Sequence, residues 1–475
     1  MPNILMAASE AAPFVKTGGL ADVLGSLPQA LARNSHKVSV VIPNFRGAAP
    51  ADAVRVWEYM NAGAGLNRFT ATILRATRGG VDFYFVDIPF LFDREGIYSD
   101  KKGDYPDNHI RFAAFSHAVI GIARHIVRPD VIHCHDWQAA LVPFYLKHYL
   151  KNDPRLAHIK TLFTIHNLGY QGHFSDPYRI LNDIGIGPEL FTVQNLEFFG
   201  GVNFLKAGLT ASDALSTVSK GYAREIQTPE YGFGLDGVLR DRSGQLTGIL
   251  NGVDYADWDP RVDRHIAAKY GPDDLSGKKA CREALLEAFG LPADVSDRPI
   301  LGIVSRFAGQ KGFDLLAEIS GELLACDITL IALGTGEPQY EKFFLQLAED
   351  RPWQARVKIA YDNRLAHMIE AGSDIFLMPS RYEPCGLNQI YSLRYGTPPV
   401  VRATGGLDDT IEEDTGFKFQ EYTGGALLDA IEQALKAFAE KPSWRHRMRR
   451  GMLKDFSWNA SAFEYSALYG RLLKG

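Results

Sequence analysis

The stretch Pro379–Gly406 reads PSRYEPCGLNQIYSLRYGTPPVVRATGG and alternates between helix and strand patterns. The apolar run Asp374–Met378 directly before it predicts a buried strand, and residues 387–395 predict a helix that ends at Gly396. Pro398–Val401 predicts a second short strand. A strand, a helix and a further strand in this order are typical of a parallel α/β sheet.

Each of these two strands is followed by a turn with functional potential. Turns after neighbouring parallel strands lie at the same edge of a sheet, where ligands bind in open α/β folds. The first turn carries one carboxylate, Glu383, and the second is Thr404-Gly405-Gly406. Helix starts at such turns offer free backbone N–H groups and the positive end of the helix dipole, which suit a phosphate group. We therefore interpret this edge as a ligand site rather than as a solvated surface turn.

The same alternation begins upstream, near Pro299. Strands are predicted at Pro299–Val304, Ile328–Leu333 and Val357–Ala360, and a helix from Gln310 to Leu324. The residues that this pattern brings to strand ends or helix starts are Arg306, Lys311, Gly334, Tyr361, Glu383 and Gly405. Arg offers a fork of donors to phosphate oxygens and Lys a point charge, so together they fit a diphosphate.

The first half of the chain repeats this organisation. Helices are predicted at Leu20–Arg33 and Asn108–Val127, and strands at Asn3–Ala8, Val38–Ile42, Val81–Val86, Asp130–His135, Lys160–Ile165 and Ala214–Val218. The pairing of strands within residues 47–102 is left open. Polar groups again follow the strands: Lys16 with the Gly18-Gly19 turn, Asp136, His166 and Ser219. The Lys16-Thr17-Gly18-Gly19 sequence lacks the GxGxxG dinucleotide fingerprint and, alone, is as often a plain turn.

The domain organisation follows from a polar, interrupted region at residues 254–297. We predict a Rossmann-like domain over 1–250, a linker region over 251–297, a second Rossmann-like domain over 298–455, and a C-terminal helix over 456–475 that can cross back to the first domain. Two doubly wound units joined by a linker predict a cleft between them.

Composition places the chain among ordinary globular proteins. It has 475 residues, 46% hydrophobic and 23% charged, with a net charge of −5. This charge gives no reason to expect nucleic acid or an anionic membrane as a partner. We find no run of about 18 apolar residues and no basic start of a signal peptide. Four widely spaced cysteines predict neither disulfides nor a zinc cluster and favour a cytoplasmic location.

Two patterns raise the question of a metal. His133 and His135 can share one face of a strand, but no third ligand follows at a fitting spacing, and a histidine hydrogen-bonded in the core is the more frequent case. Asp257-Trp258-Asp259 superficially matches the DxD of metal-dependent sugar transferases. No strand precedes it, so we interpret it as incidental and expect no metal and no cofactor.

Eight motifs together carry a resemblance to the bacterial glycogen synthase family, which includes the plant starch synthases, over essentially the whole chain. They are KTGGLADV (16–23), HCHDWQAA (133–140), TIHNLGYQG (164–172), NFLKAGL (203–209), GILNGVD (248–254), SRFAGQKG (305–312), EPCGLNQIYSLRYGTPPVVR (383–402) and TGGLDDT (404–410). Each motif is moderately specific alone, and the ordered set is highly specific.

The resemblance implies the GT-B fold, in which two Rossmann-like, doubly wound parallel-sheet domains face each other across a deep cleft. It also implies transfer of glucose from ADP-glucose to the non-reducing end of an α-1,4-glucan such as glycogen, with retained configuration and without metal or cofactor. The catalytic residues it implies are Glu383, His166 and Asp136. The substrate-binding residues it implies are Lys16, Gly18, Gly19, Asp22, Asn251, Arg306, Lys311, Gly334, Tyr361, Cys385, Gly386, Leu387, Thr404, Gly405 and Gly406.

Departures from the family pattern and rival functions remain. Asn388 stands where the family usually has Thr, Asp408 where Ala is common, and Phe307-Ala308 where Leu-Thr is usual. The rivals are a GT-B enzyme with another donor or acceptor, such as a UDP-sugar transferase or an α-glucan phosphorylase, and a non-catalytic glucan-binding relative. Retention by a covalent intermediate and retention by attack from the leaving-group face both stay open.

Overall fold

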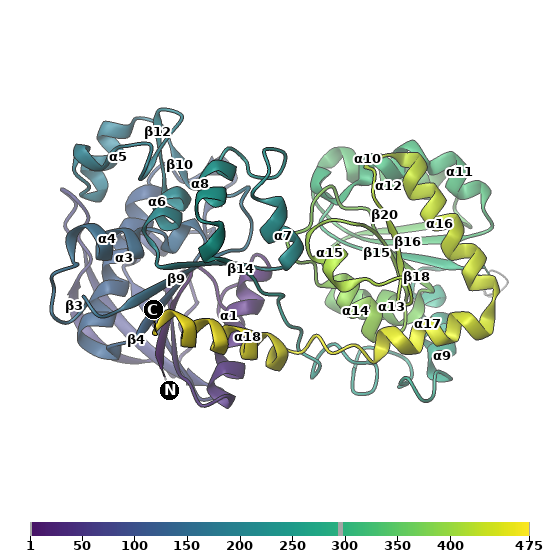
Figure 1. Ribbon diagram of the computed structural model, residues 1–475. Coiled ribbons are helices and arrows are strands. Elements are labelled where there is room, and N and C mark those ends of the chain that lie inside the picture. Colours follow the sequence, from purple (N-terminus) through teal and green to yellow (C-terminus); the bar gives the residue numbers. More distant parts are fainter. Residues whose placement is uncertain (1, 293–297, 475) are drawn as a thin grey trace. The chain divides into compact units, whose positions relative to one another are not determined.

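The computed structural model describes residues 2–292 and 298–474, which form two compact units. The first unit contains the residues up to Val218, Ala223–Gly252 and the residues from Trp458 onward. The second contains Ser219–Tyr222 and Val253–Ser457. Each unit has a central sheet with helices packed against it (Figure 1).

The central sheet of the first unit, within its described residues, has nine strands in the order β14-β13-β9-β8-β1-β2-β5-β4-β3. The seven strands from β14 to β5 pair in parallel, whereas β4 and β3 pair antiparallel at one edge. The strands are β1 (Asn3–Ala7), β2 (Lys37–Pro43), β3 (Val54–Asn61), β4 (Thr70–Arg78), β5 (Val81–Asp87), β8 (Val131–His135), β9 (Lys160–Ile165), β13 (Ala214–Thr217) and β14 (Leu246–Gly248).

Helices and two small sheets complete the first unit. The helices are α1 (Gly19–Arg33), α2 (Pro89–Phe92), α3 (Asn108–Ile122), α4 (Leu141–Tyr149), α5 (Pro177–Ile184), α6 (Phe204–Ala211), α8 (Asp236–Asp241) and α18 (Trp458–Leu472), while the residues of α7 (Lys220–Glu225) are divided between the units. The small strands are β6 (Ser99–Asp100), β7 (Gly103–Asp104), β10 (His173–Phe174), β11 (Glu197–Phe198) and β12 (Gly201–Asn203).

The C-terminal helix α18 lies beside α1, although more than 400 residues separate them (Figure 1). Trp458, Tyr465 and Tyr469 are buried in the same apolar cluster as Leu24 and Leu31 of α1. A hydrogen bond of 2.8 Å joins the imidazole of His36 to Ser466 at the rim of this contact. Helices α1 and α18 therefore share one hydrophobic core.

The second unit has a parallel sheet in the order β17-β16-β15-β18-β19-β20. Its strands are β15 (Ile300–Val304), β16 (Thr329–Gly334), β17 (Ala355–Ile359), β18 (Ile375–Met378), β19 (Pro399–Arg402) and β20 (Phe417–Phe419). Its helices are α9 (Gly277–Ala288), α10 (Phe313–Glu318), α11 (Ser320–Ala325), α12 (Pro338–Asp350), α13 (Asn363–Gly372), α14 (Asn388–Arg394), α15 (Gly405–Thr410), α16 (Gly424–Ala439) and α17 (Lys441–Met452).

Both faces of this sheet are buried under helices. Leu301 and Ile303 of β15 join the core formed with α10, α11 and α16, whereas Ile300 joins a second core with α9 and α13. Successive strand residues point to opposite faces, so a strand covered on both sides must be apolar throughout. This explains why these strands read as unbroken apolar runs.

Most predicted elements of the second half are confirmed, with two corrections. The helix predicted from Gln310 to Leu324 is interrupted: a 3₁₀ turn at Gly309–Lys311 precedes α10, and α11 follows separately. Gly312, with φ +75°, starts α10 in a backbone conformation that the continuous helix does not allow. The interrupted region 254–297 contains α9, which packs on α13 and was not predicted.

The elements predicted for the first half of the chain also agree with the structure. The six strands predicted there are confirmed, and the pairing that the sequence left open is an antiparallel extension, β3-β4-β5. The predicted helix over 108–127 is α3 followed by a π-helical turn at Ala123–Val127. These 20 residues are long and apolar enough to cross a membrane, but 67% of their most apolar 18-residue stretch is buried inside the protein, as in a core helix.

Candidate active site

Lys311 and Glu383 form an ion pair at the sheet edge of the second unit, with 2.6 Å between Nζ and Oε2. Lys311 ends the turn after β15, and Glu383 lies in the loop after β18, the neighbouring strand. Two hydrogen bonds tie these loops together: the Arg381 N–H donates to the Gln310 carbonyl, and the Gln310 side-chain amide donates to the Tyr382 carbonyl. The backbone thus fixes the pair before any ligand binds.

Glu383 is nearly inaccessible, with 6% of its surface exposed. Ser380 Oγ donates a second hydrogen bond to the same Oε2, at 3.0 Å. The Lys311 side chain is 21% exposed, so part of it reaches the surface while its ammonium neutralises the Glu383 carboxylate. An ammonium has three donors, and one bond to Glu383 leaves the others able to meet a phosphate.

The second glycine turn, Thr404-Gly405-Gly406, is hydrogen-bonded to the Glu383 loop and packs closely against it. The Gly406 N–H donates to the Glu383 carbonyl at 3.0 Å, and a Cβ on Gly406 would lie 2.0 Å from the Cys385 carbonyl oxygen. Gly386 has φ +69°, which favours glycine, and Leu387 precedes the first residue of α14. These glycines are therefore required by the packing of the two turns, whatever they bind.

Three further predicted residues lie at the same edge but do not touch the ion pair. Arg306 follows β15 and is exposed, and among the described residues its side chain has no ion pair or hydrogen bond. Tyr361 follows β17 and is 84% exposed. Gly334 ends β16, and a Cβ there would lie 2.0 Å from the Ser305 carbonyl oxygen, so its glycine serves the contact between neighbouring strand ends.

In the first unit, the loop between β1 and α1 is held by a residue that the sequence analysis missed. Glu10 is 3% exposed and accepts hydrogen bonds from the Thr17 N–H, the Thr17 hydroxyl and the Gly18 N–H. Lys16 Nζ lies 2.6 Å from Asp22 Oδ1 in the first turn of α1. The loop is thus anchored through its backbone, while Lys16 stays near the surface.

Gly18 and Gly19 differ from the glycines of the second unit. A Cβ on either would meet no atom within 4 Å, and neither has a positive φ. Nothing in the described residues requires glycine here. Open space over a glycine at the start of a 15-residue helix fits the close approach of a bound group to backbone N–H groups.

Asp136 has a strained backbone next to His166. Its φ of +55° and ψ of −178° are unusual for a residue with a side chain, and such strain clusters at functional sites. The His166 N–H donates to Asp136 Oδ1 at 2.8 Å. Burial raises the pKa of Asp136 to about 7, although hydrogen bonds from the His166 and Asn167 backbone N–H groups favour the charged form. This carboxyl group therefore titrates near neutral pH.

His166 belongs to a chain of three histidines. Its Nε2 lies 3.0 Å from His135 Nδ1, and burial lowers the pKa of His166 to about 3, so the ring is neutral at neutral pH. His133 lies against His135 with ring centroids 4.0 Å apart, as predicted for one face. His133 bonds to Tyr469 and Thr164, which makes it the core-bonded histidine that the sequence favoured.

Asn251, which follows β14, is 7% exposed, and its Oδ1 has no hydrogen-bond partner among the described residues. A buried acceptor without a partner is rare unless a ligand or water satisfies it. This is consistent with the substrate-binding role that the resemblance implies for Asn251.

Three positioning residues, Glu10, Ser380 and Tyr98, were not predicted. Glu10 directly precedes the first turn after β1, so the strand-end rule could have indicated it. Ser380 adjoins the predicted Glu383 loop after β18, so the strand-end rule could have indicated this residue too. Tyr98, whose hydroxyl donates to Glu10 Oε1 at 2.6 Å, comes from a distant loop and carries no sequence signal.

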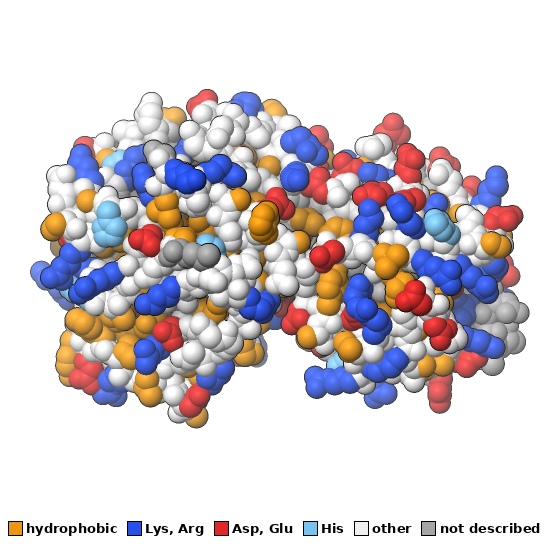
Figure 2. Space-filling model, turned by 60° about the horizontal axis from the view of Figure 1, so that its bottom comes forward, with side chains coloured by type: hydrophobic (Ala, Val, Ile, Leu, Met, Phe, Trp, Pro, Cys, Tyr) orange, Lys and Arg blue, Asp and Glu red, His pale blue; other side chains and the backbone are white. Residues whose placement is uncertain are grey.

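Charges on the viewed face of both units are of mixed sign. Figure 2 shows Lys and Arg side chains interspersed with Asp and Glu side chains, which fits the small net charge of −5. No single sign of charge dominates this face, so it offers no broad field to attract a charged ligand.

Two family models match the sequence: "Starch synthase catalytic domain" over residues 3–241 and "Glycosyl transferases group 1" over residues 292–450. A glycogen synthase from Koribacter versatilis is 52% identical, covering 98% of this chain and 97% of that protein. A glycogen synthase from Myxococcus xanthus is 47% identical, with 99% of each covered.

A solved structure is similar over the whole chain. It is the catalytic domain of starch synthase IV from Arabidopsis thaliana bound to ADP and acarbose, with a TM-score of 0.89, 30% identity and 100% of both chains covered. A sucrose-phosphate synthase from Thermosynechococcus elongatus, at TM-score 0.64 and 18% identity, shares the fold. These likenesses confirm the predicted GT-B class of fold.

Proposed function

The chain belongs to the glycogen and starch synthase family of glycosyltransferases, and from that membership we propose that it transfers glucose from ADP-glucose to the non-reducing end of an α-1,4-glucan, with retained configuration. The observation that carries the donor assignment is the full-length likeness to a starch synthase solved with ADP. The geometry supports it, because the second unit places two cations and one carboxylate at one sheet edge.

In the second unit, Arg306 and Lys311 would bind the diphosphate of the donor. Arg306 is exposed and uncommitted among the described residues, so a phosphate does not compete with an existing partner. Lys311 would bridge the phosphate and Glu383, which would bind glucosyl hydroxyl groups. In the transfer, the bond between glucosyl C1 and the β-phosphate oxygen breaks and a bond to the acceptor hydroxyl oxygen forms. The proton of that hydroxyl passes to the departing diphosphate or to water, and ADP leaves with its remaining charge stabilised by the two cations.

The glycine turns of the second unit would complete the donor site. Cys385, Gly386 and Leu387 form the loop that leads into α14, and Thr404-Gly405-Gly406 precedes or begins α15. The Gly386 and Leu387 N–H groups would face phosphate or sugar oxygens, whereas the Thr404 and Gly406 N–H groups donate to the Arg402 and Glu383 carbonyls. Gly334 keeps the neighbouring turn closely packed. Tyr361, which is exposed, would stack on the adenine ring.

In the first unit, His166 and the Lys16 loop would act on the same reaction. A neutral His166 can hydrogen-bond to a sugar hydroxyl without adding positive charge beside a ring that becomes oxocarbenium-like. Asp136 would orient His166 through its backbone N–H. Lys16, the open Gly18-Gly19 backbone and Asn251 would bind the sugar nucleotide, and Asp22 would hold Lys16.

Three further assignments belong to this proposal. The domain roles follow the predicted boundaries, with acceptor binding over 1–250 and donor binding over 298–455. Neither unit needs a metal or cofactor for the transfer, because protein cations take the place of a metal at the diphosphate. A cytoplasmic location is supported by the four cysteines, all within the described residues, none of which forms a disulfide.

The experiment is a donor panel with glycogen as acceptor. Purified protein receives ADP-glucose or UDP-glucose, each with labelled glucose, and both the released nucleoside diphosphate and the label in glycogen are measured. We expect ADP-glucose to be used with a kcat/KM at least about tenfold higher. Preference for UDP-glucose would replace the donor assignment, and glycogen binding without transfer from either donor would favour the non-catalytic relative. Nuclear magnetic resonance of the new linkage tests retention.

A further inference from the structure

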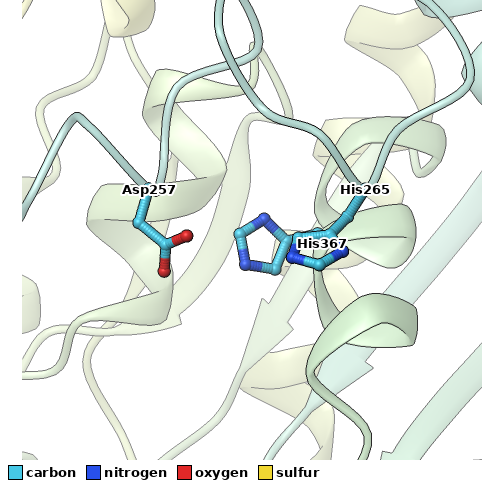
Figure 3. A group of neighbouring side chains, drawn as sticks. All are labelled: Asp257, His265 and His367. Carbon is cyan, nitrogen blue, oxygen red and sulfur yellow. The ribbon is translucent and has the colours of Figure 1, made fainter. Parts of the chain in front are cut away.

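We propose that Asp257, His265 and His367 form a binding site for a divalent transition metal ion such as Zn²⁺, outside the transferase site. Among residues 2–292 and 298–474, these three side chains form a group of potential metal ligands whose donor atoms all lie within 4.8 Å of one another. Figure 3 shows the two imidazoles close together, with the Asp257 carboxylate turned toward them. All three belong to the second unit.

His367 is the strongest argument for a ligand. Its side chain, on α13, is fully buried, and its Nε2 has no hydrogen-bond partner within the described part of the chain. Its other ring nitrogen, Nδ1, lies 2.8 Å from Oδ2 of the buried Asp263. Because a carboxylate only accepts, Nδ1 carries a proton, and in the neutral form of the ring the lone pair is then on Nε2. A buried, unpartnered imidazole lone pair costs free energy unless a ligand uses it.

The Asp263–His367 contact is the arrangement that metal-binding histidines have in proteins. There, a carboxylate accepts from one ring nitrogen and fixes the orientation and basicity of the other. Asp263 is itself held, because it also accepts from the Tyr395 hydroxyl and from the His265 N–H.

His265 and Asp257 supply the remaining ligands from the chain segment before α9. The rings of His265 and His367 have centroids 4.8 Å apart. Arg264 Nε lies 3.4 Å from His265 Nε2, at the outer limit of a hydrogen bond, and its exposed side chain can turn to solvent. Zinc bonds to His and Asp are about 2.0–2.2 Å long, so the ligand atoms around a bound ion lie closer together than the 4.8 Å limit of this group. The exposed Asp257 side chain can move to close this gap.

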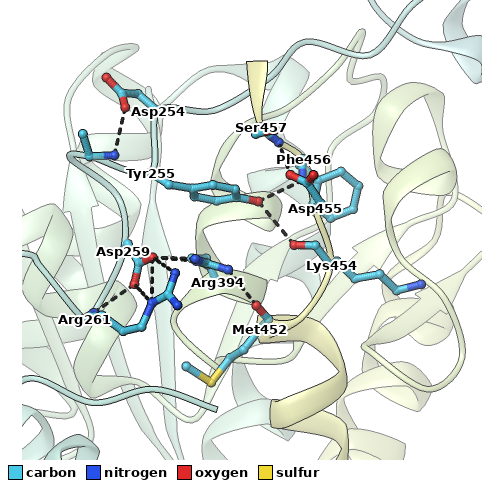
Figure 4. A network of polar contacts seen from close by, with 11 residues as sticks. Asp254, Tyr255, Asp259, Arg261, Arg394, Met452, Lys454, Asp455, Phe456 and Ser457 are labelled. Carbon is cyan, nitrogen blue, oxygen red and sulfur yellow. Dashed lines mark hydrogen bonds and ion pairs between the residues drawn. The ribbon is translucent and has the colours of Figure 1, made fainter. Parts of the chain in front are cut away.

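The surroundings hold this segment in place. The Trp258 ring stacks on the His367 ring, with centroids 3.7 Å apart, and also on the Tyr391 ring, with centroids 4.0 Å apart. Asp259 accepts from both Arg261 and Arg394, and the Arg394 guanidinium lies over the Tyr255 ring (Figure 4). The two carboxylates of the Asp257-Trp258-Asp259 sequence thus differ: Asp259 is committed to arginines, and Asp257 is available to a metal.

Two imidazoles and one carboxylate are a ligand set that Zn²⁺ takes, with a fourth position left for water. A bound ion would join the segment around Asp257 and His265 to α13. It would therefore stabilise the fold of the second unit by an amount that grows with the logarithm of the metal concentration above its dissociation constant. This role differs from that of the DxD of metal-dependent sugar transferases, because the ion would not hold the donor.

The test uses the full chain, expressed without a histidine tag and stripped of metal with a chelator. Zn²⁺ is titrated in competition with a chromophoric chelator, Co²⁺ is added separately for its visible absorption, and the melting temperature is measured with and without Zn²⁺. The variants are Asp257→Ala and His265→Ala. Matched controls are Asp273→Ala and His446→Ala, which remove an exposed carboxylate and an exposed imidazole elsewhere in the second unit.

We expect one Zn²⁺ per chain, a tetrahedral Co²⁺ spectrum and a higher melting temperature in Zn²⁺ for the unaltered protein and both controls. Each ligand variant should bind Zn²⁺ at least about tenfold more weakly and lose the Co²⁺ spectrum. His367→Gln, if it folds, should behave in the same way. Absence of Zn²⁺ binding, or equal binding by the ligand variants and the controls, would overturn the proposal.

Discussion

Lys311 Nζ lies 2.6 Å from Glu383 Oε2, and the Glu383 side chain is only 8% exposed. Removal of one partner of a buried ion pair leaves an uncompensated charge, which costs more than the pair contributes. We therefore expect Lys311→Met to lower the free energy of unfolding by about 2–4 kcal/mol. Transfer should fall by about 100-fold or more, because in the proposed mechanism Lys311 also binds the diphosphate. Urea unfolding and labelled transfer measure the two effects.

The double variant Lys311→Met/Glu383→Gln separates these effects. It leaves no buried charge, so most of the lost stability should return, whereas transfer should stay low. If the two substitutions instead lowered stability additively, the pair would not be coupled in the way its geometry indicates.

Glycines of the two units should respond differently to a Cβ. The Cβ that Gly18→Ala adds meets no atom within 4 Å. The free energy of unfolding should therefore change by less than about 0.5 kcal/mol, while the KM for ADP-glucose rises. Gly406→Ala would place a Cβ 2.0 Å from the Cys385 carbonyl oxygen and should lower stability by about 1–3 kcal/mol. Thermal unfolding and initial rates test both. An unchanged KM for ADP-glucose in Gly18→Ala would contradict the proposal that the loop between β1 and α1 binds the donor.

Arg306 offers a test of function without a cost in stability. It is exposed and has no side-chain partner among the described residues, so Arg306→Ala should unfold as the unaltered protein does, within about 0.5 kcal/mol. Transfer should fall by about 100-fold, and Arg306→Lys should recover part of it. Arg351→Ala removes another exposed arginine of the same unit and should change neither property.

The stability of the protein should carry a pH dependence from Asp136. Burial raises its pKa in the folded state to about 7, from 3.8. Between these values the unfolded chain has lost the proton that the folded chain keeps, so this group lowers stability as pH rises. Asp136→Asn, which cannot ionise, should gain stability relative to the unaltered protein between about pH 4.5 and about pH 8 in urea unfolding. A difference that is constant with pH would contradict the raised pKa.

Strand positions were predictable because parallel strands buried on both faces must be apolar, and this pattern is local. The placement of Arg306, Gly334 and Tyr361 at one edge followed from the same rule and is confirmed by the strand order. Helix α9 was missed because its segment is polar except for the face that contacts α13. Helix propensity and hydrophobic periodicity describe single segments, so they do not show that a distant helix such as α13 will cover the apolar face of α9.

The finer structure of the site could not be predicted from single segments. The bond between Ser380 and Glu383 needs the loop conformation, and the contact of Tyr98 with Glu10 joins residues 88 apart. The grouping of Asp257 and His265 with His367 depends on how α13 packs against a segment about 100 residues away. The sequence predicted at which sheet edges these polar groups lie, and long-range packing determined which side chains meet there.

The most direct test of the account is the amount of glucose passed from labelled ADP-glucose to glycogen, measured together with the ADP released. We expect equal amounts of both products from the unaltered protein and from Glu413→Ala, which removes an exposed carboxylate of the second unit. Glu383→Ala and Arg306→Ala should each reduce both products by about 100-fold or more. Transfer that survives both substitutions unchanged would contradict the assignment of the site.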